Sequence, residues 1–546
     1  MRSIPVILLF LCSFLPDSLL NAQTDEYKYY YRVYFTDKGA NSPQAFSPDM
    51  ILSQKAIDRR IKAGVDFPDY RDLPVFREYI DQITGLGFTL HCTSKWLNTA
   101  LFKTKNETGI SQILALPFVL SVKMVKRPAG KSQFIDKLDL PVINADTPPY
   151  DRPITMVNGY PLHLSGYDGT NILIAVLDGG FTFADKATSL SRLRNRGGIK
   201  YTYDFVNKNR FVYSYHTHGT AVLSILAGQI PGAIAGTAPS ANFLLLRTED
   251  GNSEFPVEED FWAAGAEFAD SAGADIISSS LGYYKFDAPE MDHSFSELDG
   301  NTTFVSRAAD VAASKGILVV CSAGNERNKP WQRIIAPSDG DSVLASAAVD
   351  GNNIISSFSS AGPSADGQVK PDLSTMGVTI VVQMSESDLI RSNGTSFSCP
   401  VLSGMTACLL EAVPEADNME IINALHQSAD RANAPDSLYG YGIPDMTKAL
   451  EILQDNHLLM PDNELAVTPN PTDGEFELIF RQPPESLNIE IAASSGRILY
   501  RNNFREYAGR NLRITALNNM EDGIYFMKIS TESRTFTKKI LLLHSR

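Results

Sequence analysis

Ser396 stands where a helix is expected to begin. Gly394 permits a tight turn just before it, and Pro400 is tolerated only in the first turn of a helix. A hydroxyl at a helix start lies beside free backbone N–H groups and the positive end of the helix dipole, which favour a developing oxyanion. Ser396 is therefore a candidate nucleophile, and an ordinary N-cap serine is the competing interpretation.

A nucleophilic serine needs a base and a carboxylate, and His218 and Asp178 are the candidates. His218 begins a largely apolar helical stretch, so one ring nitrogen can face a cleft while a carboxylate fixes the other. Asp178 ends the β-branched run 171–177, and open α/β sheets place their sites at the carboxyl ends of such strands. A turn-capping aspartate is the alternative for Asp178, and His216 is more simply a partly exposed histidine.

Asn325 ends a second buried strand, predicted over 316–321. Its side-chain amide could donate to an oxyanion, with the backbone N–H of Ser396 as the other half of the hole. Because Gly324 precedes it, a left-handed turn asparagine is a serious alternative. The run 274–281 predicts another strand of the same sheet, and it leads into Gly282.

Composition places these candidates in a large soluble protein. The chain has 546 residues, enough for about three or four domains. Its formal charge of -15 and pI near 5.1 argue against general nucleic-acid binding and against a polybasic membrane-surface protein. We therefore expect no nucleic-acid partner.

The N-terminus predicts export. Arg2 precedes an apolar run, Ile4 to Leu15, that is too short to span a bilayer, and Leu20-Asn21-Ala22 offers a cleavage site. Residues 1–22 are therefore predicted to be a secretory signal peptide.

Four cysteines remain after that peptide: Cys92, Cys321, Cys399 and Cys408. They are widely scattered, and three of them lie in strongly apolar segments. We therefore expect free, buried thiols.

The remaining chain divides into modules. Residues 23–130 read as β-α-β-β-α-β, with an additional basic helix at 55–62 that is expected to present a solvated face. Residues 131–453 form an α/β unit whose first part, 131–153, is an exposed, cleavable linker. After a polar linker at 454–464, residues 465–546 are rich in strands and predict a small β-sandwich.

Several motifs, taken in order, resemble the subtilisin family of serine peptidases, peptidase S8. They are Ala175 to Gly180, His218-Gly219-Thr220, Ser278 to Gly282, Ser322 to Asn325 and Gly394 to Pro400, with smaller agreements between Gly166 and Leu453. The same triad occurs on unrelated folds in other orders, and the order Asp, His, Ser belongs to this family. The resemblance implies an α/β fold: a subtilisin-like parallel sheet with helices on both faces.

The resemblance also implies roles for the candidates. Ser396 would form the acyl-enzyme, His218 would be general base and later acid, Asp178 would orient the imidazole, and Asn325 would donate to the oxyanion. Ala221 stands where the family often has a second histidine, and Gly179 replaces the Ser or Thr that usually follows the aspartate. Neither departure removes a catalytic atom.

Substrate contacts are implied for two segments on which an extended peptide would add as a strand. Their residues are Ser280, Leu281, Gly282, Ala323 and Gly324. Tyr283 and Tyr284 would either narrow a pocket or pack on the surface. No cofactor is required by this chemistry. Structural calcium occurs in the family, but no acidic cluster in the sequence matches a calcium loop well enough to assign ligands.

The flanking modules carry resemblances of their own. The element order of the first module resembles the propeptide that assists folding and covers the active site, so the chain's own propeptide is the expected intramolecular inhibitor. The stretch 467–476, with Gly523 to Phe526 and the ending Lys538 to Leu541, resembles the C-terminal sorting domain of the Bacteroidetes type IX secretion system. A carbohydrate-binding or adhesion module is the alternative. The sorting domain implies the type IX machinery as a partner and a secreted or outer-surface location.

Two functions remain open at this point. The first is a secreted serine endopeptidase acting on proteins or peptides, and the second is a catalytically silent surface binding or adhesion protein on the same fold. Every triad position is filled, which favours the enzyme.

Overall fold

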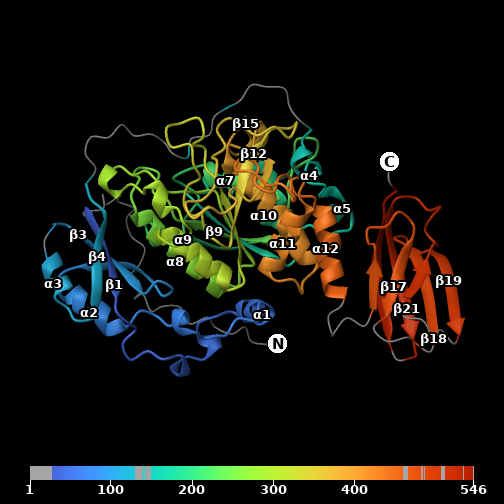
Figure 1. Ribbon diagram of the computed structural model, residues 1–546, viewed down its shortest axis with the longest axis horizontal. Coiled ribbons are helices and arrows are strands. Elements are labelled where there is room, and N and C mark those ends of the chain that lie inside the picture. The colour runs from blue at the N-terminus through green and yellow to red at the C-terminus, as the bar shows by residue number, and fades with distance from the viewer. Residues whose placement is uncertain are drawn as a thin grey trace.

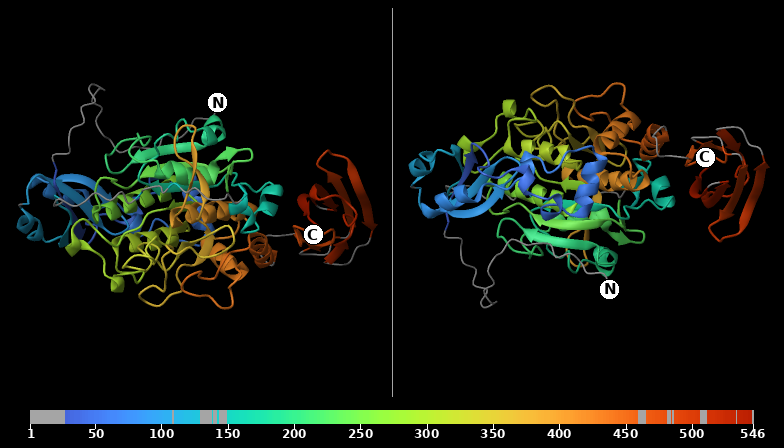
Figure 2. Two further views of the ribbon diagram at one scale, coloured as in Figure 1. Left: turned by 90° about the horizontal axis from the view of Figure 1, so that it is seen from above. Right: turned by 90° about the horizontal axis from the view of Figure 1, so that it is seen from below.

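The computed structural model describes residues 27–107, 109–128, 138, 142, 149–458, 465–480, 484, 486–505, 511–532 and 534–544. The predicted signal peptide lies outside these residues, as does most of the predicted linker 131–153. Figure 1 shows an N-terminal domain, a large central domain and a C-terminal β domain. The two further views in Figure 2 place the first and last of these at opposite ends of the central domain.

The N-terminal domain has the predicted element order. Its antiparallel sheet has the strand order β2-β3-β1-β4, with β1 (Tyr29–Phe35), β2 (Thr89–Ser94), β3 (Thr99–Thr104) and β4 (Val119–Lys126). Helices α2 (Arg77–Gly85) and α3 (Ile110–Leu114) pack on it, and Val33, Phe102 and Ile83 are fully buried between sheet and helix. The β-α-β-β-α-β prediction is therefore confirmed, with one further helix between β1 and α2.

A seven-stranded parallel sheet forms the centre of the molecule. Its order is β13-β12-β11-β10-β5-β9-β6. The strands are β5 (Leu173–Asp178), β6 (Ile199–Asp204), β9 (Asn242–Arg247), β10 (Ile276–Ser279), β11 (Leu318–Ser322), β12 (Val343–Val349) and β13 (Leu373–Met376). Every residue of β5 is buried, as expected for a strand covered on both faces.

Helices cover both faces of this sheet. The longer ones are α7 (His218–Ala227), α8 (Val257–Ala272), α9 (Phe304–Ser314), α10 (Thr395–Ala412), α11 (Asn418–Ser428) and α12 (Met446–Leu458). Shorter elements are α4 (Arg152–Thr155), α5 (Tyr160–Leu164), α6 (Ser191–Asn195), β7 (Gln229–Ile230), β8 (Ile234–Ala235), β14 (Ile380–Gln383) and β15 (Leu389–Ser392). Because side chains alternate along a strand, Val176 joins the core of α7 and α10, whereas Leu177 joins that of α8 and α9.

The strand order brings the candidate site residues to one edge. Strands β11, β10 and β5 are neighbours and run in the same direction, so their carboxyl ends lie side by side. Asp178 ends β5, and Ser280 and Asn325 follow β10 and β11 closely. Helix α10 begins at the same edge, since the Ser280 hydroxyl donates to the main-chain oxygen of Ser396 at 2.8 Å.

Helix α1 (Gln54–Lys62) docks the N-terminal domain on the central domain. The prediction of a solvated basic face was wrong, because Arg59 and Arg60 are both buried. Arg59 donates to the main-chain oxygens of Lys315 and Ala274, just beyond the carboxyl ends of α9 and α8. A positive charge there complements the negative ends of both helix dipoles.

Two glycines make room for this docking. A Cβ on Gly273, the left-handed C-cap of α8, would lie 2.8 Å from Lys55 Cβ. A Cβ on Gly316, which follows α9 with φ of 83°, would lie 2.9 Å from Ala63 Cβ. Both helix ends are thus shaped for close contact with α1.

Four carboxylates on α8, named here the α8 acidic row, accept donors from the N-terminal domain. The row consists of Glu259, Asp260, Glu267 and Asp270, all buried. Arg32 donates to Asp260 at 2.6 and 2.9 Å and lies over the Phe304 ring.

The other end of the α8 acidic row binds different donors. Glu267 accepts from the Ser94 hydroxyl and from the backbone nitrogens of Lys95 and Trp96. Asp270 accepts from Arg59 and Arg60.

Substitution of Arg60 tests this interface. Arg60 bridges Asp72 at 2.7 Å and Asp270 at 2.6 Å, and all three side chains are fully buried. Removing it takes a cation from two buried carboxylates, although Arg59 still contacts Asp270 and Lys315 still lies 3.5 Å from Asp72, so Arg60→Ala is expected to destabilise the unprocessed protein by about 3 kcal/mol in urea unfolding. Arg77 forms an exposed ion pair with Asp81, and Arg77→Ala should cost under about 1 kcal/mol. Equal effects of the two substitutions would contradict the assignment.

The C-terminal domain is a β-sandwich. One sheet has the order β16-β17-β20 and the other β19-β18-β21-β22. The strands are β16 (Leu465–Thr468), β17 (Phe476–Phe480), β18 (Ser486–Ala493), β19 (Ile498–Arg505), β20 (Asn511–Ile514), β21 (Gly523–Thr531) and β22 (Thr535–Leu542). Apolar residues of both sheets, such as Leu478 and Ile489, share one core. The sandwich prediction is confirmed, although it did not assign β16 and β22 as strands.

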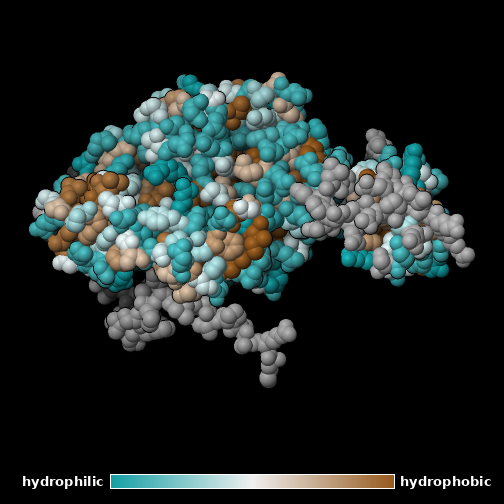
Figure 3. Space-filling view, turned by 60° about the horizontal axis from the view of Figure 1, so that its bottom comes forward, coloured by the Kyte–Doolittle hydropathy of each residue, from teal (hydrophilic) through white to brown (hydrophobic). Residues whose placement is uncertain are grey.

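The surface is mixed in character. Figure 3 shows hydrophilic residues over most of one face, with apolar residues gathered mainly on the N-terminal domain. Leu114 and Leu120 of that domain are exposed. Within the described residues, no helix combines the length and the apolar character needed to cross a bilayer. All four cysteines there are free, as predicted, but Cys92 is only partly buried.

Candidate active site

Asp178 and His218 meet at the carboxyl edge of the sheet. His218 is the first residue of α7, and its Nδ1 lies 2.9 Å from both carboxylate oxygens of Asp178. Asp178 is fully buried, and its Oδ1 also accepts from the backbone nitrogen of Gly179 at 2.7 Å. The carboxylate therefore fixes the orientation of the ring and leaves Nε2 as the nitrogen available for proton transfer.

The structure also locates His216. The backbone nitrogen of His218 donates to His216 Nδ1 at 3.0 Å. His216 thus supports the start of α7, and its side chain is half-buried, in agreement with the sequence-based interpretation.

Ser396 lies in the first turn of α10, as predicted. Its hydroxyl donates to the main-chain oxygen of Ser280 at 3.4 Å, and among the described residues no hydrogen bond joins it to His218. The ring of His218 lies over that of Phe397, the next residue, with 6.2 Å between centroids. Rotation about the Cα–Cβ bond of Ser396 is therefore the movement that would bring its hydroxyl toward His218, and apo hydrogen bonds of this kind are often long.

Asn325 is oriented by Thr395. Its Oδ1 accepts from the backbone nitrogen of Thr395 at 2.9 Å and from the Thr395 hydroxyl at 3.0 Å. Because the oxygen is engaged, the amide NH₂ faces the other way. A point at the Cβ position of Gly394 would lie 3.6 Å from Asn325 Nδ2 and 3.7 Å from the Ser396 nitrogen. The two donors therefore border one space beside Gly394.

The predicted substrate segments pass on either side of Ser396. Ser280 and Leu281 are buried, and Ser280 is tied to Ser396 through both its hydroxyl and its main-chain oxygen. On the other side, Ala323 donates to the main-chain oxygen of Ser346, and the Gly324 nitrogen donates to the Thr395 hydroxyl at 3.2 Å. Gly282 ends one of these segments and Gly324 ends the other. Both glycines lie close to the side chain of Ile335.

Tyr283 and Tyr284 have different environments. Tyr283 is fully buried and donates its hydroxyl to Glu249, so it neither lines an open pocket nor packs on the surface. Burial raises the pKa of the Tyr283 hydroxyl well above its ordinary value. Tyr284 is half-buried, donates to Glu326 at 2.7 Å and packs on Trp331. Of the two side chains, only that of Tyr284 reaches solvent.

Arg247 is a residue of this region that the sequence did not single out. It ends β9, donates from Nε to the main-chain oxygen of Gly179 at 3.1 Å, and binds both carboxylate oxygens of Asp204. The ring of Tyr215 lies 3.8 Å from its guanidinium carbon. Arg247 thus holds the loop that follows Asp178. The sequence did not indicate a role for Arg247, because its partners Gly179 and Asp204 are distant in the chain.

Leu138, in the predicted linker, lies against the residue that follows Asp178. A Cβ added to Gly179 would collide with Leu138 Cδ1. Leu138 is 5% exposed and packs with Leu177 in one apolar cluster. The absence of a side chain at Gly179 therefore makes room for the side chain of Leu138.

An acidic cluster lies beside Tyr283. Glu249, Glu254 and Glu258 each bring one carboxylate oxygen within 4.8 Å of the others, and two of the three are buried. The sequence did not reveal this cluster, since its members are spaced irregularly along a loop and a helix start. Acidic groups also cluster without an ion, so calcium stays a prediction with no assigned ligands.

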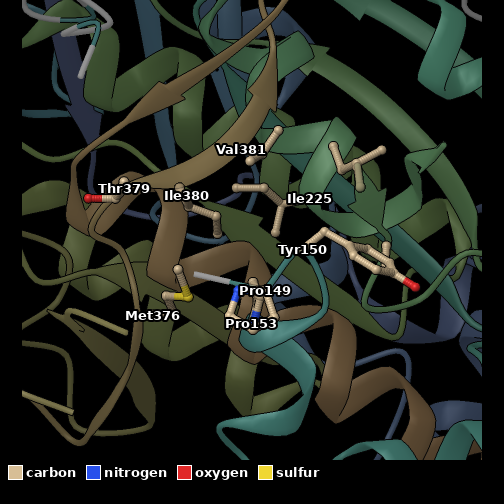
Figure 4. A pocket seen from close by; sticks show the side chains of 10 residues that line it. Pro149, Tyr150, Pro153, Ile225, Met376, Thr379, Ile380 and Val381 are labelled. Carbon is tan, nitrogen blue, oxygen red and sulfur yellow. The ribbon is translucent and has the colours of Figure 1, made fainter. Parts of the chain in front are cut away.

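A small, mainly apolar cavity of about 20 Å³ lies away from the catalytic candidates. Figure 4 shows Ile225, Met376, Ile380 and Val381 gathered around Pro149, Tyr150 and Pro153. None of its lining residues is a candidate site residue. These contacts anchor Pro149, Tyr150 and Pro153 on the central domain.

Comparisons with known proteins place the three modules in families. Residues 169–442 match the subtilase family, residues 30–139 match the peptidase S8 propeptide domain of Bacteroidota, and residues 466–543 match a secretion-system C-terminal sorting domain. The chain belongs to the subtilase family and is a serine-type endopeptidase. Its sorting domain indicates export through the type IX secretion system to the cell surface or medium.

Characterised relatives agree with this family. Subtilisin DY of Bacillus licheniformis is 28% identical over 310 residues, covering 56% of this chain and 100% of the relative. The thermophilic serine proteinase of Bacillus sp. (strain AK1) is 30% identical over 271 residues, covering 49% and 59%. A solved structure, the prenylagaramide maturation protease PagA, aligns with a TM-score of 0.43 and 25% identity over 54% of this chain and 98% of that chain. The family match and the subtilisin relative confirm the resemblance to subtilases, and the parallel sheet with helices on both faces confirms the predicted fold class.

Proposed function

We propose that this endopeptidase hydrolyses peptide bonds through an acyl-enzyme formed on Ser396. The contact of His218 Nδ1 with both Asp178 oxygens, at the sheet edge where α10 begins, is the observation that carries this proposal. In the proposed reaction, His218 Nε2 takes the hydroxyl proton as the Ser396 oxygen attacks the carbonyl carbon, and Asp178 stabilises the imidazolium. His218 then protonates the leaving amine, and water hydrolyses the ester by the same route.

The oxyanion donors complete this proposal. The tetrahedral oxygen would occupy the space flanked by Asn325 Nδ2 and the Ser396 N–H. Thr395 supports the Asn325 donor, because its backbone N–H and its hydroxyl both donate to Asn325 Oδ1. No cofactor is needed for these steps, since hydroxyl, imidazole, carboxylate and amide supply every group.

The N-terminal domain would restrain this activity before processing. Leu138 lies at Gly179, next to the catalytic aspartate, and the arginines of α1 and β1 fasten the domain to α8. The side chain of Leu138 at Gly179 would leave less room for a substrate there. We infer that cleavage in the linker, before the anchored residue Pro149, precedes full activity.

Active-site labelling tests the proposed nucleophile. A serine-directed phosphonate should form one adduct on the processed wild-type protein, and peptide mass spectrometry should place it on Ser396. Ser398, two residues on, donates to the Thr395 main chain and provides a matched control, because Ser398→Ala should still be labelled. An adduct at another residue would refute Ser396. No adduct and no hydrolysis after processing would favour a silent binding protein.

Truncation tests the proposed route to the cell exterior. The signal peptide would carry the chain across the inner membrane, and the domain at 465–546 would direct it across the outer membrane. Deleting residues 465–546 is therefore expected to leave the protein in the periplasm, as judged by cell fractionation and immunoblotting. Normal surface appearance of the truncated chain would reject the sorting role.

A further inference from the structure

Ile335 occupies the space between the two substrate segments. A Cβ on Gly282 would lie 2.5 Å from Ile335 Cγ1, and a Cβ on Gly324 would lie 3.0 Å from both Cγ1 and Cδ1. The same side chain thus reaches both segments, although they follow different strands. Ile335 is 9% exposed, so little of it is left in contact with solvent.

This space adjoins the carbonyl that would be attacked. Ser280 begins one segment and contacts Ser396, and Asn325, the oxyanion donor, follows Gly324 directly. The residue that supplies the scissile carbonyl must hold that carbonyl between Asn325 and Ser396. The side chain of that residue is attached to the carbon next to the carbonyl carbon. It would therefore enter the gap between the two substrate segments, which end at Gly282 and Gly324.

Ile335 cannot easily retreat from this position. The next residue, Ala336, exchanges hydrogen bonds with Tyr283, at 2.8 and 3.2 Å. The main-chain oxygen of Ile335 accepts from both the backbone nitrogen and the hydroxyl of Ser338. A β-branched side chain is also stiff at its first torsion. The backbone is therefore held from two sides, and the side chain has few alternative positions.

We propose that Ile335 closes the pocket for the side chain on the acyl side of the scissile bond and limits it to small residues such as alanine, serine and glycine. This inference rests on the proposed role of Ser396. A phenylalanine or leucine would have to displace Ile335, and forcing extra atoms into a packed site is costly. A difference of one methylene in a tight pocket already changes kcat/KM by roughly 10–200-fold.

Peptides that differ only at the acyl-side residue test this proposal. On processed enzyme whose concentration is set by phosphonate titration, the alanine peptide should exceed the phenylalanine peptide in kcat/KM by about 100-fold or more. Ile335→Gly should reduce this ratio at least tenfold by raising cleavage of the phenylalanine peptide, with Ile335→Ala intermediate. Ile335→Leu, which conserves volume, should keep the preference for alanine and serves as the control.

The outcomes separate this inference from the proposed function. A wild-type enzyme that is titrated at Ser396 but cleaves after phenylalanine or leucine as well as after alanine overturns the role of Ile335 alone. An unchanged ratio in Ile335→Gly and Ile335→Ala, with normal titration, does the same. If the glycine variant does not fold, the wild-type and alanine-variant ratios decide. Failure of titration and hydrolysis in the wild type overturns both proposals together.

Discussion

Replacing Ser396 by alanine is expected to lower kcat for peptide hydrolysis by about 10⁶-fold. The substitution removes the atom that forms the acyl-enzyme, while Asn325 and the backbone nitrogen at position 396 remain in place. Residual hydrolysis should therefore reflect only substrate binding and the oxyanion donors. Initial rates on a peptide substrate measure the effect, with the linker of the variant cut in trans by immobilised wild-type enzyme.

Two controls make this result specific to the hydroxyl. Ser398→Ala changes a buried hydroxyl of the same helix and should stay within a few-fold of wild type, because the Ser398 hydroxyl donates to the main-chain oxygens of Thr395 and Ser346 and the proposed reaction does not use it. Thermal unfolding of both variants should match that of the unprocessed parent. A Ser396→Ala enzyme with more than about one-tenth of wild-type activity would contradict an acyl-enzyme on this residue.

Replacing Asp178 by asparagine is the second large expected effect, a loss of about 10⁴-fold in kcat. An amide in this position can donate to His218 Nδ1, which would place the ring proton on Nε2, the nitrogen that must accept the serine proton. The buried carboxylate also stabilises the imidazolium, and a neutral amide does not. The variant should keep its fold, because the amide has nearly the shape of the carboxylate.

Rates and labelling together check this prediction. Asp178→Asn should lower the rate of phosphonate labelling at Ser396 along with kcat, since both reactions need the base. Asp388, an exposed carboxylate that accepts from the Ser385 hydroxyl, supplies the control. Asp388→Asn should leave both rates within a factor of about two. A labelling rate in Asp178→Asn equal to wild type would show that His218 does not depend on Asp178.

The parts of the fold that could be predicted are those whose signal is local. The apolar runs that became β5, β10 and β11 each end in glycine-containing turns, so the strand ends were correct to within a few residues. Because these strands are parallel, their carboxyl ends lie on one edge of the sheet. Asp178 and Asn325 therefore lie at the same edge. The long helix that contains Ser396 was predicted correctly from its uncharged sequence, but the prediction that Pro400 lies in its first turn was wrong, because α10 begins at Thr395 and Pro400 is its sixth residue.

The parts that could not be predicted depend on distant partners. Arg59 and Arg60 looked like a solvated face because their partner Asp270 is about 210 residues away in the chain. Burial of Tyr283 depends on Glu249, which follows a different strand. The small space at Ile335 depends on two glycines from two segments, and nothing near residue 335 in the sequence indicates it.

The α8 acidic row is expected to favour release of the N-terminal domain over its rebinding. In the unprocessed protein its carboxylates are dry and face Arg32, Arg59 and Arg60. If the N-terminal domain is cut and leaves, water would replace those arginines, and rebinding would require the same carboxylates to be dehydrated again. Salt also screens the attraction that would draw the domain back. We expect release of the domain to be easier than its rebinding in a saline medium outside the cell.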